Sequence, residues 1–188
     1  MSLRISFDLH DADLRHFEEL AQQTQSLERR RSAESIIAAA RDVLANGERA
    51  HLAEFVKERF SRLRAMLEMA TDADWKVSGE DQQRIVNALG CFSVAPQANG
   101  EPATAGLLDR AIMIELVSRD LEHDLVAYRD FCKFRESQLT RRAGREDLQR
   151  QHLEQRRDAL QARMHTRRQR DLDRAGSSVR KLFSLFGL

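Results

Sequence analysis

The chain has 188 residues, of which 41% are hydrophobic and 32% charged, with 2 Pro, 8 Gly and a net charge of +1. This length allows one domain with a hydrophobic core plus an appendage, and the shortage of helix breakers favours an all-α fold over sheet folds. Charges interrupt the opening residues, and no apolar run approaches the ~20 residues that cross a bilayer, so we expect a soluble, cytoplasmic protein without a signal peptide.

The small net charge hides a strong asymmetry along the chain. Residues 1–140 hold 18 Lys or Arg against 24 Asp or Glu, whereas residues 141–188 hold 13 against 6. An acidic body with a net charge of −6 thus carries a basic tail with a net charge of +7. Such a layout indicates an interaction segment.

The first part of the chain predicts an arm and two helices. Leu3–Leu9 alternates apolar and polar residues, and because a lone strand has no partner we expect an arm packed on helices. Asp11 or Asp13 then caps a helix that reaches Leu27. Ser32 is a good N-cap for the next helix, and Asn46-Gly47 is typical of its C-cap.

Two further helices follow, with a turn between them. A third helix from Glu48 to Ala70 carries an apolar and methionine stripe that we interpret as core. The turn at Thr71–Lys76 contains Trp75, which we expect to form a lid on that core. Ser78 with Asp81 resembles a capping box at the start of a fourth helix.

The densest apolar run lies in Ala105–Arg135, after a loop at Val94–Gly106 that contains both prolines. We predict one long helix here, buried on most sides at its start and half exposed at its end, with the rest of the domain packed around it. Glu115 lies inside the apolar part. A pair with Arg119, one turn on, explains it better than a metal site with His123 and Asp109.

No catalytic or metal constellation emerges from the remaining polar residues. The six histidines are dispersed, and Cys91 and Cys132 lie in apolar contexts that favour reduced core residues. We expect the paired carboxylates to be solvated, both at Asp72 and Asp74 and at positions 120, 122 and 124. We therefore predict no enzyme, no cofactor, no metal and no catalytic residue.

Residues 137–175 form an Arg-rich segment with helical propensity, with 11 Arg between Arg141 and Arg174. The simplest interpretation is a solvated helix, because its scattered apolar positions do not sustain heptads. Nucleic-acid binding is an alternative, although no aromatic residues interleave the arginines for base stacking.

An amphipathic tip, 176–188, closes the chain after Gly176. Its apolar and basic residues are candidates for contact with a partner protein or an anionic membrane surface, unless the tip docks on its own core. These candidate contact residues are Val179, Arg180, Lys181, Leu182, Phe183, Leu185 and Phe186.

The chain resembles the YkvA-like family of small bacterial helical proteins, a domain of unknown function. The resemblance lies in Ala88-Leu89, Phe92, the stretch Gly106-x-Leu108-Asp109-x-Ala111-Ile112 and the run IELVSRDLEHDLVAYRDFCKFR. A subgroup also shares the opening SLRISFDLHDADLRHF, a stretch around Phe55–Glu68 and an Arg-rich tail. The resemblance covers most of residues 1–136 and implies a helical fold, but no activity.

The loop before the central helix departs from the pattern of that family. The family usually has Pro-x-Asp-x-Ile-Pro-Asp and then a Leu-Asp-Asp pair, whereas this chain has Ala95-Pro96-Gln97, Glu101-Pro102 and Arg110 in place of the second Asp. If the acidic loop of the family binds a cation, this chain has lost that site. The remnants of the motif are Pro96, Gly106, Leu108 and Asp109.

Together these patterns predict a domain at 1–136 with about five helices, an Arg-rich helical extension at 137–175 and the tip at 176–188. The expected function is a bacterial, non-enzymatic interaction or adaptor protein that contacts a protein partner through its basic C-terminal extension. The alternatives are a peripheral protein of the inner membrane anchored by residues 179–188, or nucleic-acid binding by the Arg-rich helix. Homo-oligomerisation remains open.

Overall fold

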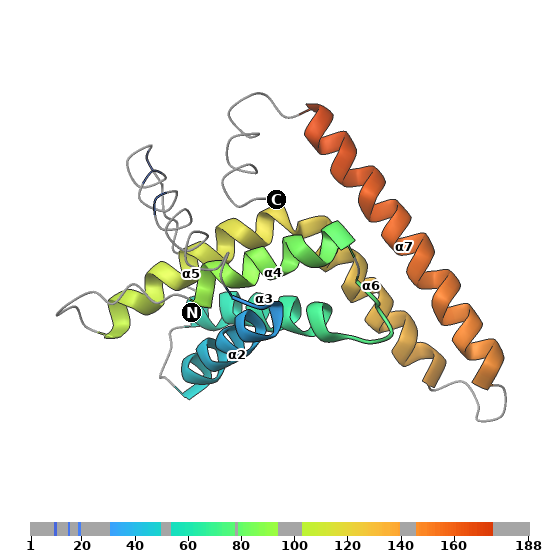
Figure 1. The fold of residues 1–188 in the computed structure, drawn as a ribbon, viewed down its shortest axis with the longest axis horizontal. Helices are drawn as coiled ribbons and strands as arrows, with labels where there is room; N and C mark the ends of the chain where they lie inside the picture. The colour runs from blue at the N-terminus through green and yellow to red at the C-terminus, as the bar shows by residue number, and fades with distance from the viewer. Residues whose placement is uncertain are drawn as a thin grey trace, which may run out of the picture.

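The structure, a computed structural model, describes residues 10, 15, 19, 31–49, 54–77, 79–93, 103–139 and 146–174. These residues form six helices and no strand, so the predicted all-α class is confirmed (Figure 1). The helices are α2 (Ala33–Arg49), α3 (Glu54–Thr71), α4 (Gly79–Ser93), α5 (Ala103–Asp120), α6 (Glu122–Leu139) and α7 (Glu146–Arg174). The predicted arm, residues 94–102 of the predicted loop and most of the predicted first helix lie outside the described residues. The predicted end of that loop at Gly106 is wrong, because α5 begins at Ala103.

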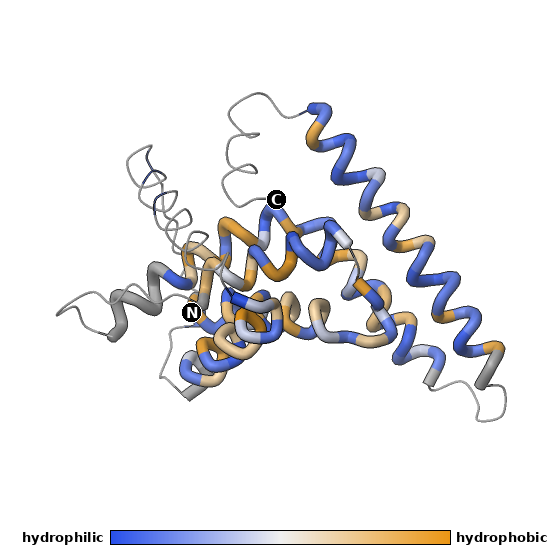
Figure 2. The backbone as a smooth tube through the Cα atoms, viewed as in Figure 1, coloured by the Kyte–Doolittle hydropathy of each residue, from blue (hydrophilic) through white to orange (hydrophobic). Residues whose placement is uncertain are grey.

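The core lies among α2 to α6. α2 packs on α3 and α4, and α3 packs on α5. Hydrophobic residues recur along each of these helices (Figure 2). The predicted stripe of α3 is confirmed as core, since Leu63 and Met66 are fully buried. Trp75 is 2% exposed and belongs to this core, so the prediction that it forms a lid on the core is wrong.

The beginning of α2 follows the prediction, but its end does not. The Ser32 hydroxyl accepts a hydrogen bond from the Ser35 amide at 3.3 Å, as an N-cap does. The predicted C-cap at Asn46-Gly47 is wrong, because α2 continues through Gly47 to Arg49. A Cβ atom at Gly47 would lie 2.1 Å from Cε1 of Phe60, so this glycine allows α2 and α3 to approach closely. The predicted start of the third helix at Glu48 is wrong for the same reason.

The long central helix of the prediction is two helices, α5 and α6, which meet at Leu121. The Leu121 amide still bonds to the Val117 carbonyl, at 3.2 Å. Near the break, however, the Ser118 hydroxyl donates to the Glu115 carbonyl, and Arg84 of α4 donates to the Asp120 carbonyl at 3.4 Å. Side chains that bond to helix carbonyls in this way bend helices, so Ser118 and the distant Arg84 together explain the break.

α7 packs along α6 at one edge of the molecule and runs in the opposite direction (Figure 1). The sequence predicted a solvated extension, and most of α7 is indeed hydrophilic (Figure 2). Leu160 and Met164 are nevertheless 2% and 4% exposed and belong to the hydrophobic core. One side of α7 is therefore part of the folded body. None of the helices described here is long and apolar enough to cross a membrane.

Candidate interaction surface on helix α7

α7 has an apolar side that faces the body and a charged side that faces solvent. Leu153, Leu160 and Met164 follow one another at spacings of seven and four, which places them on one helix face. Leu148, outside that spacing, is 47% exposed. Three apolar contacts along 29 residues form a narrow seam, so polar contacts must also determine where α7 lies.

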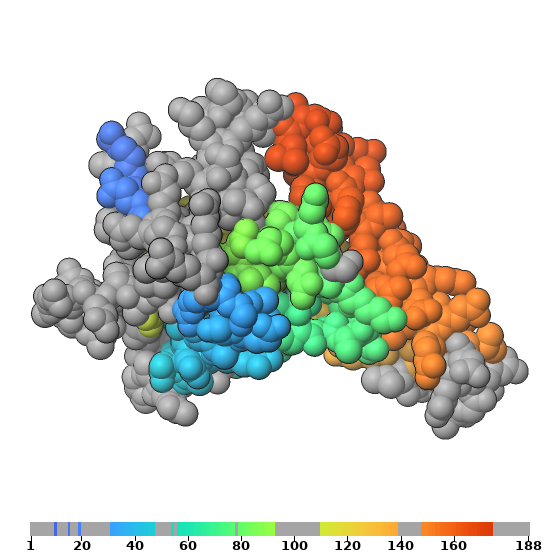
Figure 3. All heavy atoms as spheres, viewed as in Figure 1, coloured from blue at the N-terminus to red at the C-terminus, as the bar shows by residue number. Residues whose placement is uncertain are grey.

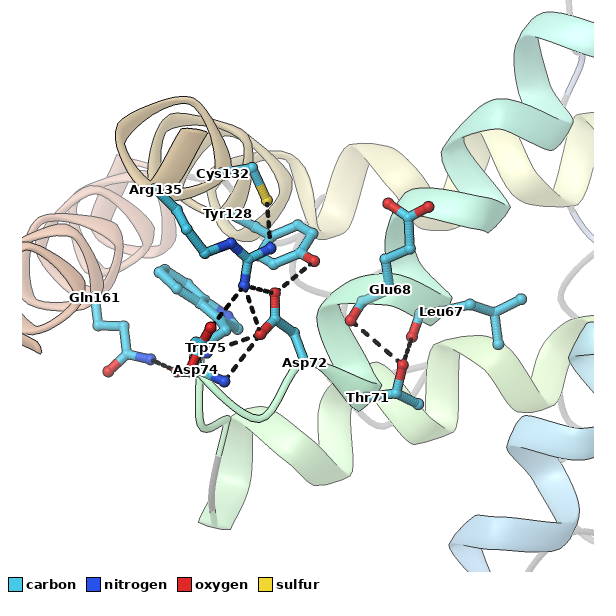
Figure 4. Close-up of polar contacts among 10 residues, drawn as sticks. All are labelled: Leu67, Glu68, Thr71, Asp72, Asp74, Trp75, Tyr128, Cys132, Arg135 and Gln161. Atoms are coloured by element: carbon cyan, nitrogen blue, oxygen red, sulfur yellow. Dashed lines mark hydrogen bonds and ion pairs between the residues drawn. The ribbon is translucent and has the colours of Figure 1, made fainter. Parts of the chain in front are cut away.

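The first polar contact of α7 is with the turn between α3 and α4, which Asp72 holds in place (Figure 4). Asp72 accepts hydrogen bonds from the Asp74 amide at 2.9 Å, from the Tyr128 hydroxyl at 3.0 Å and from Nη1 of Arg135 at 2.8 Å. Burial on its own raises the pKa of Asp72, but these donors outweigh burial and hold the pKa below its usual range. The carboxylate therefore stays ionised and ties the turn to α6.

This turn places Trp75 between α6 and α7. The indole ring packs at an angle of 64° against Tyr128, with ring centroids 5.7 Å apart, and against Phe131 at 5.1 Å. Gln161 of α7 donates a hydrogen bond to the Trp75 carbonyl at 2.9 Å (Figure 4). The turn thus holds α7 through its backbone while its side chains fill the core.

The second polar contact is an ionic cluster where α7 crosses α4 and α6. Asp81 of α4 lies 2.8 Å from Nη2 of Arg168 and 2.7 Å from Nε2 of His165, both on α7. Arg168 also reaches Asp124 of α6 at 3.5 Å, and Arg84 of α4 reaches the same Oδ1 at 3.3 Å. Three basic side chains from α4 and α7 thus share two carboxylates, one on α4 and one on α6.

Asp124 is buried and Asp120 is half-buried, so our prediction that they are solvated is wrong. The same prediction is wrong for Asp72, whose side chain is 8% exposed. Asp124 is 1% exposed, and its Oδ2 has no hydrogen-bond partner among the residues described. Burial first, and then the nearby charge of Asp81, raise the pKa of Asp124 to about 7. Burial also raises the pKa of Asp120 to about 7. Such acids can exchange protons near neutral pH, but α7 and both arginines cover Asp124, so a substrate cannot reach its carboxylate while α7 is docked.

The solvent side of α7 carries four exposed arginines in a row, Arg163, Arg167, Arg170 and Arg174. Their spacing of four, three and four residues places them on one face of the helix, and a rise of 1.5 Å per residue gives a row about 16 Å long. We call these four residues the arginine row. It lies on the part of α7 that forms the outer edge of the molecule (Figure 3).

The arginine row is not neutralised by the part of the chain that the structure describes. The carboxylates at helical spacing from it are Asp171 and Asp173. Asp171 lies 2.6 Å from Nε2 of His123, and Asp173 accepts a hydrogen bond from Gln169 at 2.9 Å. Within the described residues, no ion pair forms at any of the four guanidinium groups. The row therefore presents four positive charges to solvent.

The structure tests the residues predicted from sequence only in part. The candidate contact residues 179–186 and Pro96 lie outside the described residues, and Gly106, Leu108 and Asp109 belong to α5, where the description covers their backbone. The predicted pair of Glu115 with Arg119 is confirmed, at 3.3 Å. Cys91 and Cys132 are free thiols, as predicted. The described residues hold no group of His, Cys, Asp and Glu suited to a metal ion.

Two features of this surface were not predicted from the sequence, for different reasons. The arginine row has a local signal, its helical spacing, which a count of arginines alone does not reveal. The ionic cluster has none, because Asp81 and Arg168 are 87 positions apart and meet only in the folded chain.

No family model matches this chain, and comparisons with curated proteins and with solved structures found no match. The resemblance to the YkvA-like family therefore stays a prediction.

Proposed function

We propose that this chain is a non-enzymatic interaction protein that binds an acidic partner protein through the arginine row and the tip that follows it. The observation that carries the proposal is the row of four exposed guanidinium groups with no ion pair among the described residues. Guanidinium groups at helical spacing can form paired hydrogen bonds with carboxylates on a facing acidic helix.

The charge of the body favours a compact partner over an extended polyanion. Residues 1–140 carry a net charge of −6, which repels long nucleic acids and anionic membranes that spread beyond the row. The row is about 16 Å long, which matches about three turns of an acidic helix. In addition, residues 141–174 contain no Phe, Tyr or Trp on which bases could stack.

The docking of α7 supports this role, because it fixes the row in space. Leu160, Gln161 and Arg168 hold one side of the helix on the body, so the arginines need not be ordered when a partner binds. Preorganised contacts lose less entropy on association.

The test is co-purification after cross-linking in the cells that make the protein. A row variant with Arg163, Arg167, Arg170 and Arg174 changed to Gln is compared with the wild-type chain. A matched control replaces four exposed cations elsewhere, Arg41, Lys57, Lys133 and Arg150, so that both variants have the same net charge. We expect one protein partner to be lost from the row variant and kept by the control.

Two further probes decide between the classes of partner. Duplex DNA and anionic vesicles are mixed with the same three proteins at low and moderate salt. If the row variant loses binding to either probe and no protein partner depends on the row, the protein-partner proposal is wrong. Nucleic-acid binding or membrane attachment then takes its place.

A further inference from the structure

A second positively charged site lies away from α7, between α3, α5 and α6. It is a pocket with a volume of about 310 Å³. Arg62 of α3, Arg119 of α5 and Arg129 of α6 line it, together with Glu115, Ser118 and Val126. The volume is at the lower end of the range for small-molecule sites.

Glu115 gathers the arginines at this pocket. Its carboxylate lies 2.8 Å from Nη1 of Arg62, 3.2 Å from Nε of Arg59 and 3.3 Å from Nε of Arg119. Burial on its own raises the pKa of Glu115, but these three arginines outweigh burial and lower it, so the carboxylate stays ionised. One carboxylate therefore faces three guanidinium groups, of which Arg59 also pairs with Glu58 at 2.7 Å.

The donors at the pocket exceed the acceptors that the protein offers. Each guanidinium carries five N–H donors, whereas a carboxylate accepts about four hydrogen bonds. Arg129 forms no ion pair with any residue that the structure describes, and the remaining acid of the lining, Glu122, is exposed. Three lining arginines against two lining glutamates leave the pocket with an excess of one positive charge and with unused donors.

We propose that this pocket binds the phosphate group of a small phosphate monoester, with Arg119 and Arg129 as the main contacts. A phosphate anion complements the excess positive charge, and the fork of a guanidinium matches the geometry of phosphate oxygens. Val126 and Leu125 line the pocket beside the arginines and can contact a short hydrocarbon part. A phospholipid headgroup and a soluble phosphate ester share this chemistry.

The probes are glycerol 3-phosphate, with neutral glycerol as its control, and vesicles with phosphatidic acid, with phosphatidylcholine vesicles as their control. Calorimetry with the full chain should show saturable binding of one phosphate probe and none of its neutral control. Arg119→Gln and Arg129→Gln should each weaken binding about tenfold, whereas Arg150→Gln, an exposed arginine of α7 outside both sites, should not.

The outcomes identify the source of the phosphate group or overturn the proposal. Binding of glycerol 3-phosphate identifies a soluble ester as the source, and binding of phosphatidic acid vesicles alone identifies a lipid headgroup. No saturable binding of either probe, or binding that both variants leave unchanged, overturns the proposal. Amide NMR shifts on wild-type protein provide a second readout that needs no variant, and shifts centred away from Ser118 and Val126 also overturn it. The row variant keeps the pocket intact. A failure of the pocket proposal can therefore be distinguished from a failure of the α7 proposal.

Discussion

Arg168 of α7 donates a hydrogen bond to Oδ1 of Asp81 on α4 at 2.8 Å, although 87 positions separate the two residues in the sequence. This contact joins the basic C-terminal helix to the acidic body. It also uses an arginine that points inward, while Arg163, Arg167, Arg170 and Arg174 remain exposed on the other side. The same helix therefore provides both an attachment and a display surface.

Removing the apolar seam should weaken the attachment of α7. Leu160 is 2% exposed, so Leu160→Ala should lower the free energy of unfolding by about 3 kcal/mol. Leu148→Ala, at a 47% exposed position of the same helix, should cost under about 0.5 kcal/mol. Urea unfolding followed by the fluorescence of Trp75 measures both. Equal costs for the two variants would show that α7 is not docked in solution.

The buried side chain of Asp72 should matter more than its neighbour Asp74, although Arg135 contacts both. The Asp72 side chain is 8% exposed and that of Asp74 is 57% exposed. Asp72→Ala leaves Arg135 and Tyr128 without their acceptor, and we expect a loss of about 3 kcal/mol of stability. Asp74→Ala should change stability by less than about 0.5 kcal/mol. Chemical denaturation of both variants checks the ranking, which a larger effect at Asp74 would contradict.

Gly47→Ala should destabilise the protein, although alanine favours helices. The new Cβ would lie 2.1 Å from Cε1 of Phe60, whose side chain is buried, so α2 and α3 must move apart. Overpacking of this kind costs about 1–3 kcal/mol, more than the gain of about 1 kcal/mol in helix propensity. A second change, Phe60→Leu, should make the alanine at position 47 less harmful. A single variant that melts above the wild type would contradict the close approach.

Stability should fall as the pH rises towards neutrality. Folding raises the pKa of Asp124 from 3.8 to about 7, so the folded state binds more protons between these values. The stabilising effect of that proton is fully present below the unfolded pKa and is lost as the pH rises through about 7. Between about pH 5.5 and pH 7 the loss is about 2 kcal/mol for this group.

The variant Asp124→Asn isolates this effect, because its side chain has the same shape and does not titrate. Urea midpoints at about pH 5.5 and pH 8 should differ less for the variant than for the wild type. Asp120 should supply the remaining difference, since its pKa is also raised to about 7. The acids with lowered pKa values, Asp72, Glu115 and Glu34, titrate below this window. A wild-type stability that rises with pH across it would contradict the burial of Asp124.

The fold class and much of the core could be predicted, because the apolar spacing of a helix such as α3 is a local property. Leu63 and Met66 were placed correctly for this reason. The end of α2 could not be predicted. Asn46-Gly47 has the pattern of a C-cap, but contact with Phe60 makes Gly47 part of the helix. Nor could the break at Leu121 be predicted, because it depends on Arg84, a residue 36 positions before Asp120.

The candidate surface was predictable in composition but not in geometry. The charge asymmetry identified the Arg-rich segment, and the spacing of the arginine row is visible once a helix is assumed. Which arginines point outward depends on how α7 docks, and that depends on Asp81, Asp124 and the carbonyl of Trp75. Those contacts bring together distant parts of the chain, so local patterns do not contain them.

The most direct measurement is photo-cross-linking in cells with a reactive residue at Thr166, which is exposed next to the arginine row. Asp158, also exposed on α7 but on a different helix face, is the matched control position. We predict a cross-link to one acidic protein from position 166 that is absent from position 158 and lost in the row variant. Equal cross-linking from both positions, or none from position 166, would contradict the proposal that the arginine row is the contact surface.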